Sequence, residues 1–227
     1  MNVEEIYISG KSRLTYTSFG FVTAEFYEAD LIDCLELYKA VLNGDWESAS
    51  KLLADDPNSF SAPIGTDDSG ILHIAVELGE ARMGFVEKLV EFMRSEDPSE
   101  ALALRDSDGV TALFNAARAG NIKAVKLLVK NNPSLPNICN HGYLVPLHSA
   151  LRYGHKELTL YLLTVTRDDV DPSPFADKPG FELLRRALMV GFHGELYLPS
   201  PIYFLDMNYR RVPMYNFIIC RCSTVSG

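Results

Sequence analysis

One hydrophobic pattern recurs along the chain, Leu-x-x-Ala followed by a glycine four residues after the alanine. It occurs five times, and the copies close at Gly44, Gly79, Gly120, Gly154 and Gly191. A leucine and an alanine three positions apart share one face of a short helix, and glycine favours the positive φ at which such a helix ends. Successive glycines are 35, 41, 34 and 37 residues apart. Periods in this range are typical of helical solenoids.

A second apolar stretch follows each of the first four glycines and contains a pair of branched residues. The pairs are Leu52-Leu53, Leu89-Val90, Leu127-Leu128 and Leu162-Leu163. In the third unit Ile122, Val125 and Leu128 have the spacing of one helical face. Polar, glycine-containing stretches at 66–70, 106–109 and 140–142 predict turns between the units. The pattern predicts an all-α solenoid of stacked antiparallel helix pairs, joined by hairpin-like turns that border a concave groove.

Two copies of the pattern resemble the Thr-Pro-Leu-His-x-Ala core of the ankyrin repeat. They are Thr111-Ala112-Leu113-Phe114-Asn115-Ala116 and Val145-Pro146-Leu147-His148-Ser149-Ala150. An earlier copy keeps Leu72-His73-x-Ala75 without the Thr-Pro, and the third replaces the histidine by Phe114. The copies are in phase over roughly residues 34–192. The resemblance to the ankyrin repeat family implies a protein-binding stack in which His73 and His148 hydrogen-bond between neighbouring loops.

The first unit is similar to one group within that family. Asn43-Gly44-Asp45-Trp46-Glu47-Ser48-Ala49 resembles the opening repeat of plant ankyrin proteins that carry a C-terminal membrane domain named for Pro-Gly-Gly (PGG). That domain is absent from this sequence, whereas the longer relatives are membrane-anchored. The resemblance implies a place in plant signalling or stress response. Trp46 stands at the start of an outer helix, and we interpret it as a packing residue.

Both ends of the chain depart from the repeat, which divides the sequence into three parts. Residues 1–33 lack a sustained helical period and are predicted to be a leader or N-terminal cap, partly disordered. Residues 34–193 hold about four full repeats and half of a fifth. Residues 194–227 are predicted to be an irregular tail, because Pro199 and Pro201 prevent an outer helix. This tail is either the ending of a truncated isoform or gene model, or an irregular C-terminal cap.

Charge and cysteine content narrow the partners and the compartment. A net charge of −9 argues against nucleic acid, which needs clustered Lys and Arg, and favours a basic protein partner. Four irregularly spaced cysteines are too few for a disulfide framework. No run reaches the ~18 to 20 apolar residues of a membrane span. We therefore predict a cytoplasmic protein without a span of its own, which could reach the cytoplasmic face of a membrane through its partners.

Catalytic and metal-binding signatures are missing from the sequence. Nucleophile elbows, phosphate-binding glycine loops and His-Glu-x-x-His are absent, so we predict no enzyme activity and no cofactor. Cys139 with His141, and Cys220 with Cys222, lack the paired spacing of a zinc site. The acidic run at 168–171 lacks the glycine and the terminal glutamate of a calcium-binding EF-hand loop. No metal site is predicted.

The predicted binding surface consists of the turn tips and the exposed ends of the inner helices. Its candidates are Asp67, Asp68, Ser107, Asp108, Val110, Arg118, Asn140, His141, Tyr143, Arg152 and Tyr153. Tyrosine and arginine are typical interface anchors, which singles out Tyr143, Arg152 and Tyr153. The predicted function is a non-enzymatic scaffold or adaptor for a protein partner. The alternative is a truncated regulatory form that associates with related membrane-anchored ankyrin proteins.

Overall fold

The computed structural model shows a stack of helix pairs, which confirms the predicted all-α solenoid. It describes residues 4–8, 12–16, 22–26, 28–64, 67–94, 98–170, 173–190, 203–205 and 211–213. Repeats 1 to 4 are α1 (Glu28–Asn43) with α2 (Trp46–Asp55), α3 (Ile71–Glu77) with α4 (Met83–Met93), α6 (Ala112–Ala119) with α7 (Ile122–Asn131), and α8 (Pro146–Arg152) with α9 (Lys156–Val165). A further helix, α10 (Asp177–Met189), packs on α8 as the inner helix of repeat 5.

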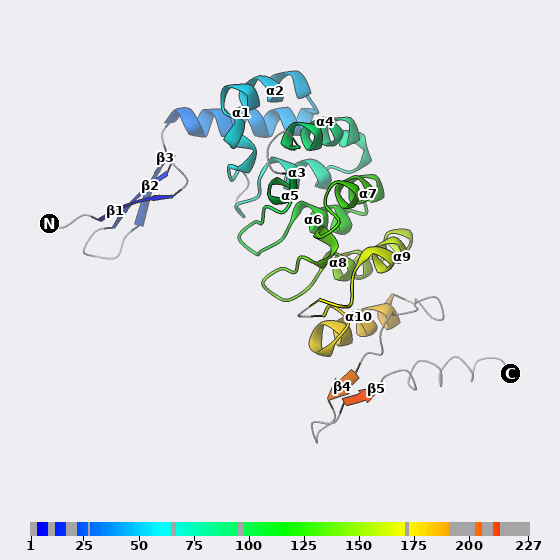
Figure 1. Ribbon diagram of the computed structural model, residues 1–227. Coiled ribbons are helices and arrows are strands. Elements are labelled where there is room, and N and C mark those ends of the chain that lie inside the picture. Colours follow the sequence, from blue (N-terminus) through cyan, green and yellow to red (C-terminus); the bar gives the residue numbers. More distant parts are fainter. Residues whose placement is uncertain are drawn as a thin grey trace.

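Figure 1 shows how these helices form two layers. The inner helices α1, α3, α6, α8 and α10 follow one another down the stack, and α4, α7 and α9 lie beside them on one side. The turns that precede α6 and α8 extend on the opposite side. Short elements fill the connections: η1 (Pro57–Ser61), η2 (Glu80–Arg82), α5 (Pro98–Ala101) and η3 (Leu135–Asn137).

The leucine and alanine of the recurring pattern form the core. All ten are buried, with at most 4% of their surface exposed: Leu37, Ala40, Leu72, Ala75, Leu113, Ala116, Leu147, Ala150, Leu184 and Ala187. The outer helices add Leu53, Leu89 and Leu128 to the same continuous core. Trp46 packs edge to face on Phe85, with ring centroids 5.4 Å apart, and this contact confirms its packing role. Each helix pair thus covers the apolar face of its neighbour.

Glycine ends the inner helices of repeats 1 to 4, as predicted. Gly44, Gly79, Gly120 and Gly154 have φ between 71° and 75°, a conformation that other residues adopt at a cost. Gly191 lies outside the described residues. At Gly120 space is a second constraint, because a Cβ there would lie 2.6 Å from Cε1 of His155.

Histidines connect neighbouring repeats. Nε2 of His73 lies 3.1 Å from the carbonyl oxygen of Val110, and Nε2 of His148 lies 3.0 Å from that of Pro179. Both bonds reach from an inner helix to the turn or helix start of the following repeat. The structural role predicted for the two histidines is therefore confirmed.

The turn tips are connected as well. Ser107 donates its backbone N–H and its hydroxyl to the carbonyl oxygen of Asp67, at 3.0 and 2.9 Å. One repeat further on, the backbone N–H of His141 donates to the carbonyl oxygen of Asp108 at 3.0 Å. The three turns are therefore held at fixed positions relative to one another.

Strands lie outside the stack in both terminal parts of the chain. β1 (Glu4–Ile8), β2 (Ser12–Tyr16) and β3 (Val22–Phe26) form an antiparallel sheet in the order β1-β2-β3, in a segment for which no strands were predicted. Helix α1 begins at Glu28, before the predicted boundary at residue 34. In the predicted tail the structure describes β4 (Tyr203–Leu205) and β5 (Arg211–Pro213), paired antiparallel. Pro199 and Pro201 lie outside the described residues.

Crossing a bilayer would require a long apolar helix in the described part of the chain. None of the helices there combines the length and the apolar character that crossing a bilayer requires.

We predict that Asn121→Ala destabilises the stack by about 2 kcal/mol. Asn121 is buried, with 1% of its surface exposed. Its Oδ1 caps α7 by accepting the N–H of Ala124 at 3.1 Å, while its Nδ2 donates to the carbonyl oxygen of Val76 in repeat 2 at 3.2 Å. The substitution removes both bonds. Urea-induced unfolding measures the loss.

Asp45→Ala is the matched control. Asp45 caps α2 through the N–H of Ser48, is more exposed, and has no bond to another repeat among the described contacts. Its replacement should cost less than that of Asn121. Equal losses for the two variants would show that the bond between repeats adds nothing.

Candidate functional site

A hollow of about 300 Å³ opens between repeats 3 and 4. We call it the repeat 3–4 hollow. Its walls come from the turns before α6 and α8, from those two helices, and from one side chain of α10. The lining residues are Asp108, Val110, Phe114, Arg118, Asn140, His141, Gly142, Leu144, His148, Ser149, Arg152, Tyr153 and Arg186.

The hollow brings together seven of the eleven residues that the sequence proposed for binding. They are Asp108, Val110, Arg118, Asn140, His141, Arg152 and Tyr153. These residues come from two turns and two helix ends, so only the stacking of repeats 3 and 4 makes them neighbours. Tyr153 keeps 52% of its surface exposed, and Arg152 is exposed beside it.

The other four candidates lie elsewhere. Asp67, Ser107 and Tyr143 are exposed at turn tips without lining the hollow. Asp68, also exposed, borders a smaller cavity of about 40 Å³ beside His73. Because the carbonyl oxygen of Asp67 accepts two hydrogen bonds from Ser107, these two residues mainly join repeats 2 and 3.

Val110 differs from the expectation that it offers an exposed side chain. It keeps only 8% of its surface exposed. Its carbonyl oxygen accepts the backbone N–H of Asp106 at 2.9 Å and is bonded to His73. These bonds hold Val110 against the stack, so it shapes the wall of the hollow and leaves little surface for a partner.

Phe114 lines the hollow and was not among the candidates. It occupies the position that holds histidine in repeats 2 and 4, where His73 and His148 bind a carbonyl of the next repeat. A phenyl ring cannot make that bond. The equivalent carbonyl oxygen, that of Leu144, accepts the N–H of Asn140, as that of Val110 accepts the N–H of Asp106, but has no histidine beside it. The replacement of the motif histidine by Phe114 is the feature of the sequence that could have identified this residue of the hollow.

The turns at the rim are rigid because each is built around one side-chain acceptor. Oδ1 of Asp106 accepts the N–H groups of Asp108 and Val110 at 2.9 and 2.8 Å. Oδ1 of Asn140 accepts those of Gly142 and Leu144, both at 3.0 Å. Such turns need no reordering when a partner arrives, which lowers the entropic cost of binding.

Tyr143 is held in a strained backbone conformation at the tip of its turn. Its φ is 61°, in the left-handed region, where the equivalent residue of the preceding repeat is Gly109 with φ 75°. Bulky residues rarely adopt this region. The side chain keeps 63% of its surface exposed. Strain retained at an exposed aromatic residue is a feature of functional positions.

Three arginines face the hollow, and their ion pairs differ. Arg118 pairs with Glu77 of repeat 2, and Arg186 pairs with Glu182. Arg152 makes no ion pair within the described part of the chain, and its guanidinium lies 5.8 Å from the ring centre of Tyr153. An arginine stacked on an aromatic ring keeps its donors available for a carboxylate.

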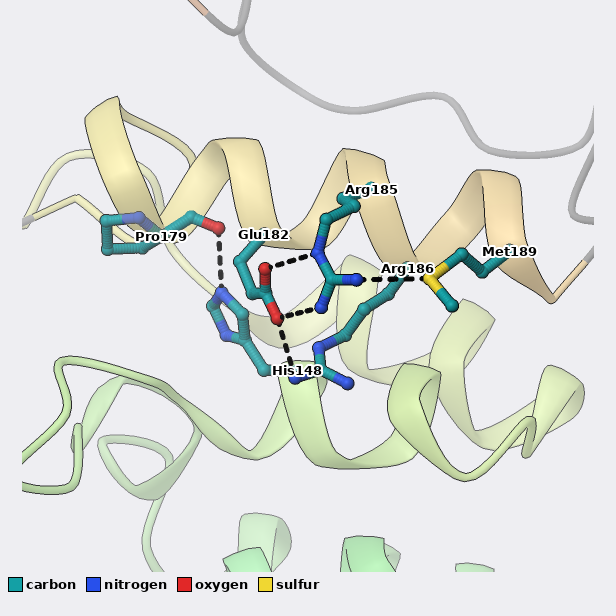
Figure 2. A network of polar contacts seen from close by, with 6 residues as sticks. All are labelled: His148, Pro179, Glu182, Arg185, Arg186 and Met189. Carbon is teal, nitrogen blue, oxygen red and sulfur yellow. Dashed lines mark hydrogen bonds and ion pairs between the residues drawn. The ribbon is translucent and has the colours of Figure 1, made fainter.

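Figure 2 shows the polar network that joins α10 to α8. The carboxylate of Glu182 lies between two guanidinium groups, at 2.6 Å from Nη2 of Arg185 and 2.6 Å from Nη2 of Arg186. The hydrogen bond from Arg185 and the charge of Arg186 lower the pKa of Glu182 to about 2. His148 reaches the same helix through Pro179.

His148 is neutral and has a defined tautomer. Its Nδ1 accepts the N–H of Val145 at 3.2 Å, so Nε2 carries the hydrogen and donates to Pro179. Burial lowers the pKa of His148 to about 4, against smaller opposing effects of its hydrogen bonds. Burial also lowers the pKa of His73. Both imidazoles form hydrogen bonds that join neighbouring repeats.

The described residues do not form a metal site. They contain no cluster of three or more His, Cys, Asp or Glu side chains that could hold a metal ion. Cys139 is half-buried with a free thiol, and its carbonyl oxygen accepts Nη1 of Arg105 at 3.1 Å.

The chain matches the family model described as ankyrin repeats (3 copies), over residues 37–133 and 72–173. It is 33% identical over 114 residues to the human Protein phosphatase 1 regulatory subunit 27, a match that covers 47% of this chain and 72% of that protein. The mouse protein of the same name is 32% identical over 91 residues, covering 40% and 57%.

Two further proteins resemble part of the chain. Human Diacylglycerol kinase iota is 28% identical over 168 residues, which is 67% of this chain and 15% of the kinase. A chain in the crystal structure of the yeast ribosomal protein Rps3 in complex with its chaperone Yar1 superposes with a TM-score of 0.52 and 23% identity, covering 62% of this chain and 95% of that one. At this level of identity the superposition shows a shared fold.

We predict that the free energy of unfolding falls by about 1 to 3 kcal/mol as the pH drops from 7 to 4. The pKa of His148 is about 4 in the folded chain, against 6.5 as the ordinary value. Between these two values the unfolded chain binds the proton and the folded chain does not, so stability is full above pH 6.5 and is lost on acidification. Denaturant unfolding across this pH range measures the change.

Two variants assign that pH dependence. His148→Asn should reduce the slope between pH 6.5 and 4, and His73→Asn should remove a further part of it, because burial also lowers the pKa of His73. A further loss below about pH 4.5 is expected from protonation of Glu182, whose folded pKa is about 2. An unchanged slope in His148→Asn would contradict the assignment.

We predict that Tyr143→Gly stabilises the chain by about 0.5 to 1 kcal/mol, because glycine adopts a φ of 61° without the steric cost that a side chain pays. Thermal unfolding measures the gain as a melting temperature higher by a few degrees. Tyr153→Gly is the control, since Tyr153 has a φ of −93° and gains nothing from glycine. If both variants lose stability equally, Tyr143 is not strained.

Proposed function

We propose that this chain, which belongs to the ankyrin repeat family, is a non-enzymatic adaptor that binds a protein partner at the repeat 3–4 hollow and the turn tips beside it. The observation that carries the proposal is the convergence of exposed tyrosine and arginine side chains on a rigid hollow of about 300 Å³. Such residues provide most of the binding energy at protein interfaces.

A regulatory role is supported by the relatives. Protein phosphatase 1 regulatory subunit 27 is a regulatory subunit by name, and the match covers 72% of the human protein. We propose that this chain likewise acts by binding another protein and not by catalysing a reaction. The matched stretch of Diacylglycerol kinase iota is only 15% of that protein, and kinase activity is not part of the proposal.

Signalling in the cytoplasm is the setting we propose for this adaptor. The plant affiliation stays a prediction that rests on the resemblance of residues 43–49, and the curated relatives reported above come from human and mouse. The proposed binding of a protein partner does not depend on whether the chain comes from a plant or an animal.

Association with related ankyrin proteins is the second candidate, and one observation favours it. Helix α10 ends with Met189 and Val190 exposed to 73% and 39%, and exposed apolar residues at the end of a repeat stack are suited to packing against another repeat. Light scattering coupled to size exclusion distinguishes the candidates, because self-assembly would give a dimer and the adaptor a monomer.

Affinity capture tests the adaptor proposal. The full chain and a Tyr143→Ala, Arg152→Ala, Tyr153→Ala variant are used as baits, and captured proteins are quantified by mass spectrometry. We expect the captured amount of each specific partner to fall by at least about 90% with the variant. Removal of interface anchors typically costs several kcal/mol of binding free energy. Thermal unfolding verifies that the variant is folded.

The matched control carries three alanines on the outer helices, at Glu87, Lys88 and Lys130, which are all exposed and do not line the hollow. It should capture the same proteins as the unchanged chain. Loss of the partners from the control, or their full retention by the hollow variant, would overturn the proposal.

A further inference from the structure

We infer that the segment bound in the repeat 3–4 hollow is an acidic peptide, with a carboxylate on Arg152 and an apolar side chain on Phe114. The inference rests on the proposed function and specifies the chemistry of its partner. It also reverses the expectation of a basic partner that the net charge of the whole chain gave.

The charged residues that line the hollow are mostly basic, whereas the chain as a whole is acidic. The chain carries a net charge of −9, yet the hollow is lined by Arg118, Arg152 and Arg186 with Asp108 as its one carboxylate. Short-range charges dominate recognition, since charges more than about 10 Å apart are largely screened at physiological salt. Arg118 and Arg186 are already paired with Glu77 and Glu182, so the unpaired positive charge that a partner meets in the hollow is that of Arg152.

Two of these arginines have unused capacity for an anion. Arg152 has no ion-pair partner within the described part of the chain, and it stands exposed at the rim. Arg186 shares the single carboxylate of Glu182 with Arg185 (Figure 2). Its Nε is buried and has no hydrogen-bond partner among the described residues. A carboxylate can bind a guanidinium through two parallel hydrogen bonds. A partner carboxylate at Arg152 would supply the ion pair that this side chain lacks within the described part of the chain.

The apolar part of the hollow is formed by Phe114 and Leu144. Phe114 is half-buried in the wall, and Leu144, also half-buried, lines the same hollow. The volume of about 300 Å³ is at the small end of the range for ligand sites and fits one or two side chains of a peptide. An apolar centre with charged groups at its rim is the usual arrangement of a protein interface.

Nucleic acid fits these observations less well. Its phosphate backbone binds extended sets of Lys and Arg and loses affinity when the protein carries a large negative charge. A small group of arginines beside the one phenyl ring of Phe114 suits a short peptide segment that bears a carboxylate.

A peptide selection tests the inference on the full chain. A displayed library of random short peptides is selected for binding, and enriched sequences are synthesised with a fluorophore for anisotropy titrations. We expect the enriched sequences to combine Asp or Glu with a leucine or aromatic residue. Arg152→Glu should weaken their binding at least about tenfold, and Phe114→Ala should weaken it as well.

Arg94→Glu is the matched control. Arg94 is an exposed arginine at the end of α4 whose only described ion pair is with Glu91 of its own helix. Its reversal changes the net charge by the same amount, so binding should stay within about twofold of that of the unchanged chain. An equal loss in both variants would show that overall charge, not the hollow, decides binding, and would overturn the inference.

Other outcomes separate this inference from the adaptor proposal. Enriched peptides rich in Lys and Arg that lose binding in the Tyr143→Ala, Arg152→Ala, Tyr153→Ala variant would overturn the acidic partner and leave the adaptor proposal intact. Peptides that bind both sets of variants like the unchanged chain would overturn both. A single-stranded DNA probe that binds through Arg152, or a selection without enrichment, would overturn the inference.

Discussion

Each repeat of this chain must bury its leucines and alanines against the next repeat, because one helix pair is too small to enclose a core of its own. Everything else in the stack follows from that constraint. The inner helices end at glycine so that the chain can turn back onto the same layer. The turns then emerge on one side, where hydrogen bonds such as that from Ser107 to Asp67 keep them in register. The candidate binding surface is a consequence of this order.

The sequence predicted those parts of the structure that depend on local patterns. Leucine, alanine and glycine at fixed spacing determine helix faces and helix ends within a single repeat, and His73 carried its role in its motif. The strands β1 to β3 were not predicted, since the lack of a helical period in residues 1–33 does not by itself indicate strands. Val110 was expected to be exposed, because nothing in the sequence shows that His73 binds its carbonyl.

The hollow could be predicted only in part, since it is made by contacts between repeats. Arg152 and Tyr153 were identified from their place at a helix end. Arg186 belongs to α10 and approaches the hollow only because that helix packs on α8. The sequence shows Phe114 as an exception to the motif. Only the structure shows that the hydrogen bond lost by this exception is the one to the Leu144 carbonyl in the following turn. For the same reason the net charge of the chain was a poor guide to the charge of this surface.

The replacement of histidine by Phe114 has a consequence for the cooperativity of the array. In a stack where each repeat contacts only its neighbours, the strength of every interface determines whether the repeats unfold together or in blocks. The interface between repeats 3 and 4 lacks the bond from an inner-helix histidine to the following turn that joins repeat 2 to repeat 3 and repeat 4 to α10. Its histidine bond runs in the other direction, from Nε2 of His155 at the start of α9 to the carbonyl oxygen of Arg118 in α6, at 2.9 Å. A partner in the hollow contacts both sides of this interface at once. We therefore expect a bound partner to strengthen the coupling between repeats 3 and 4, so that they unfold together more often than in the free chain.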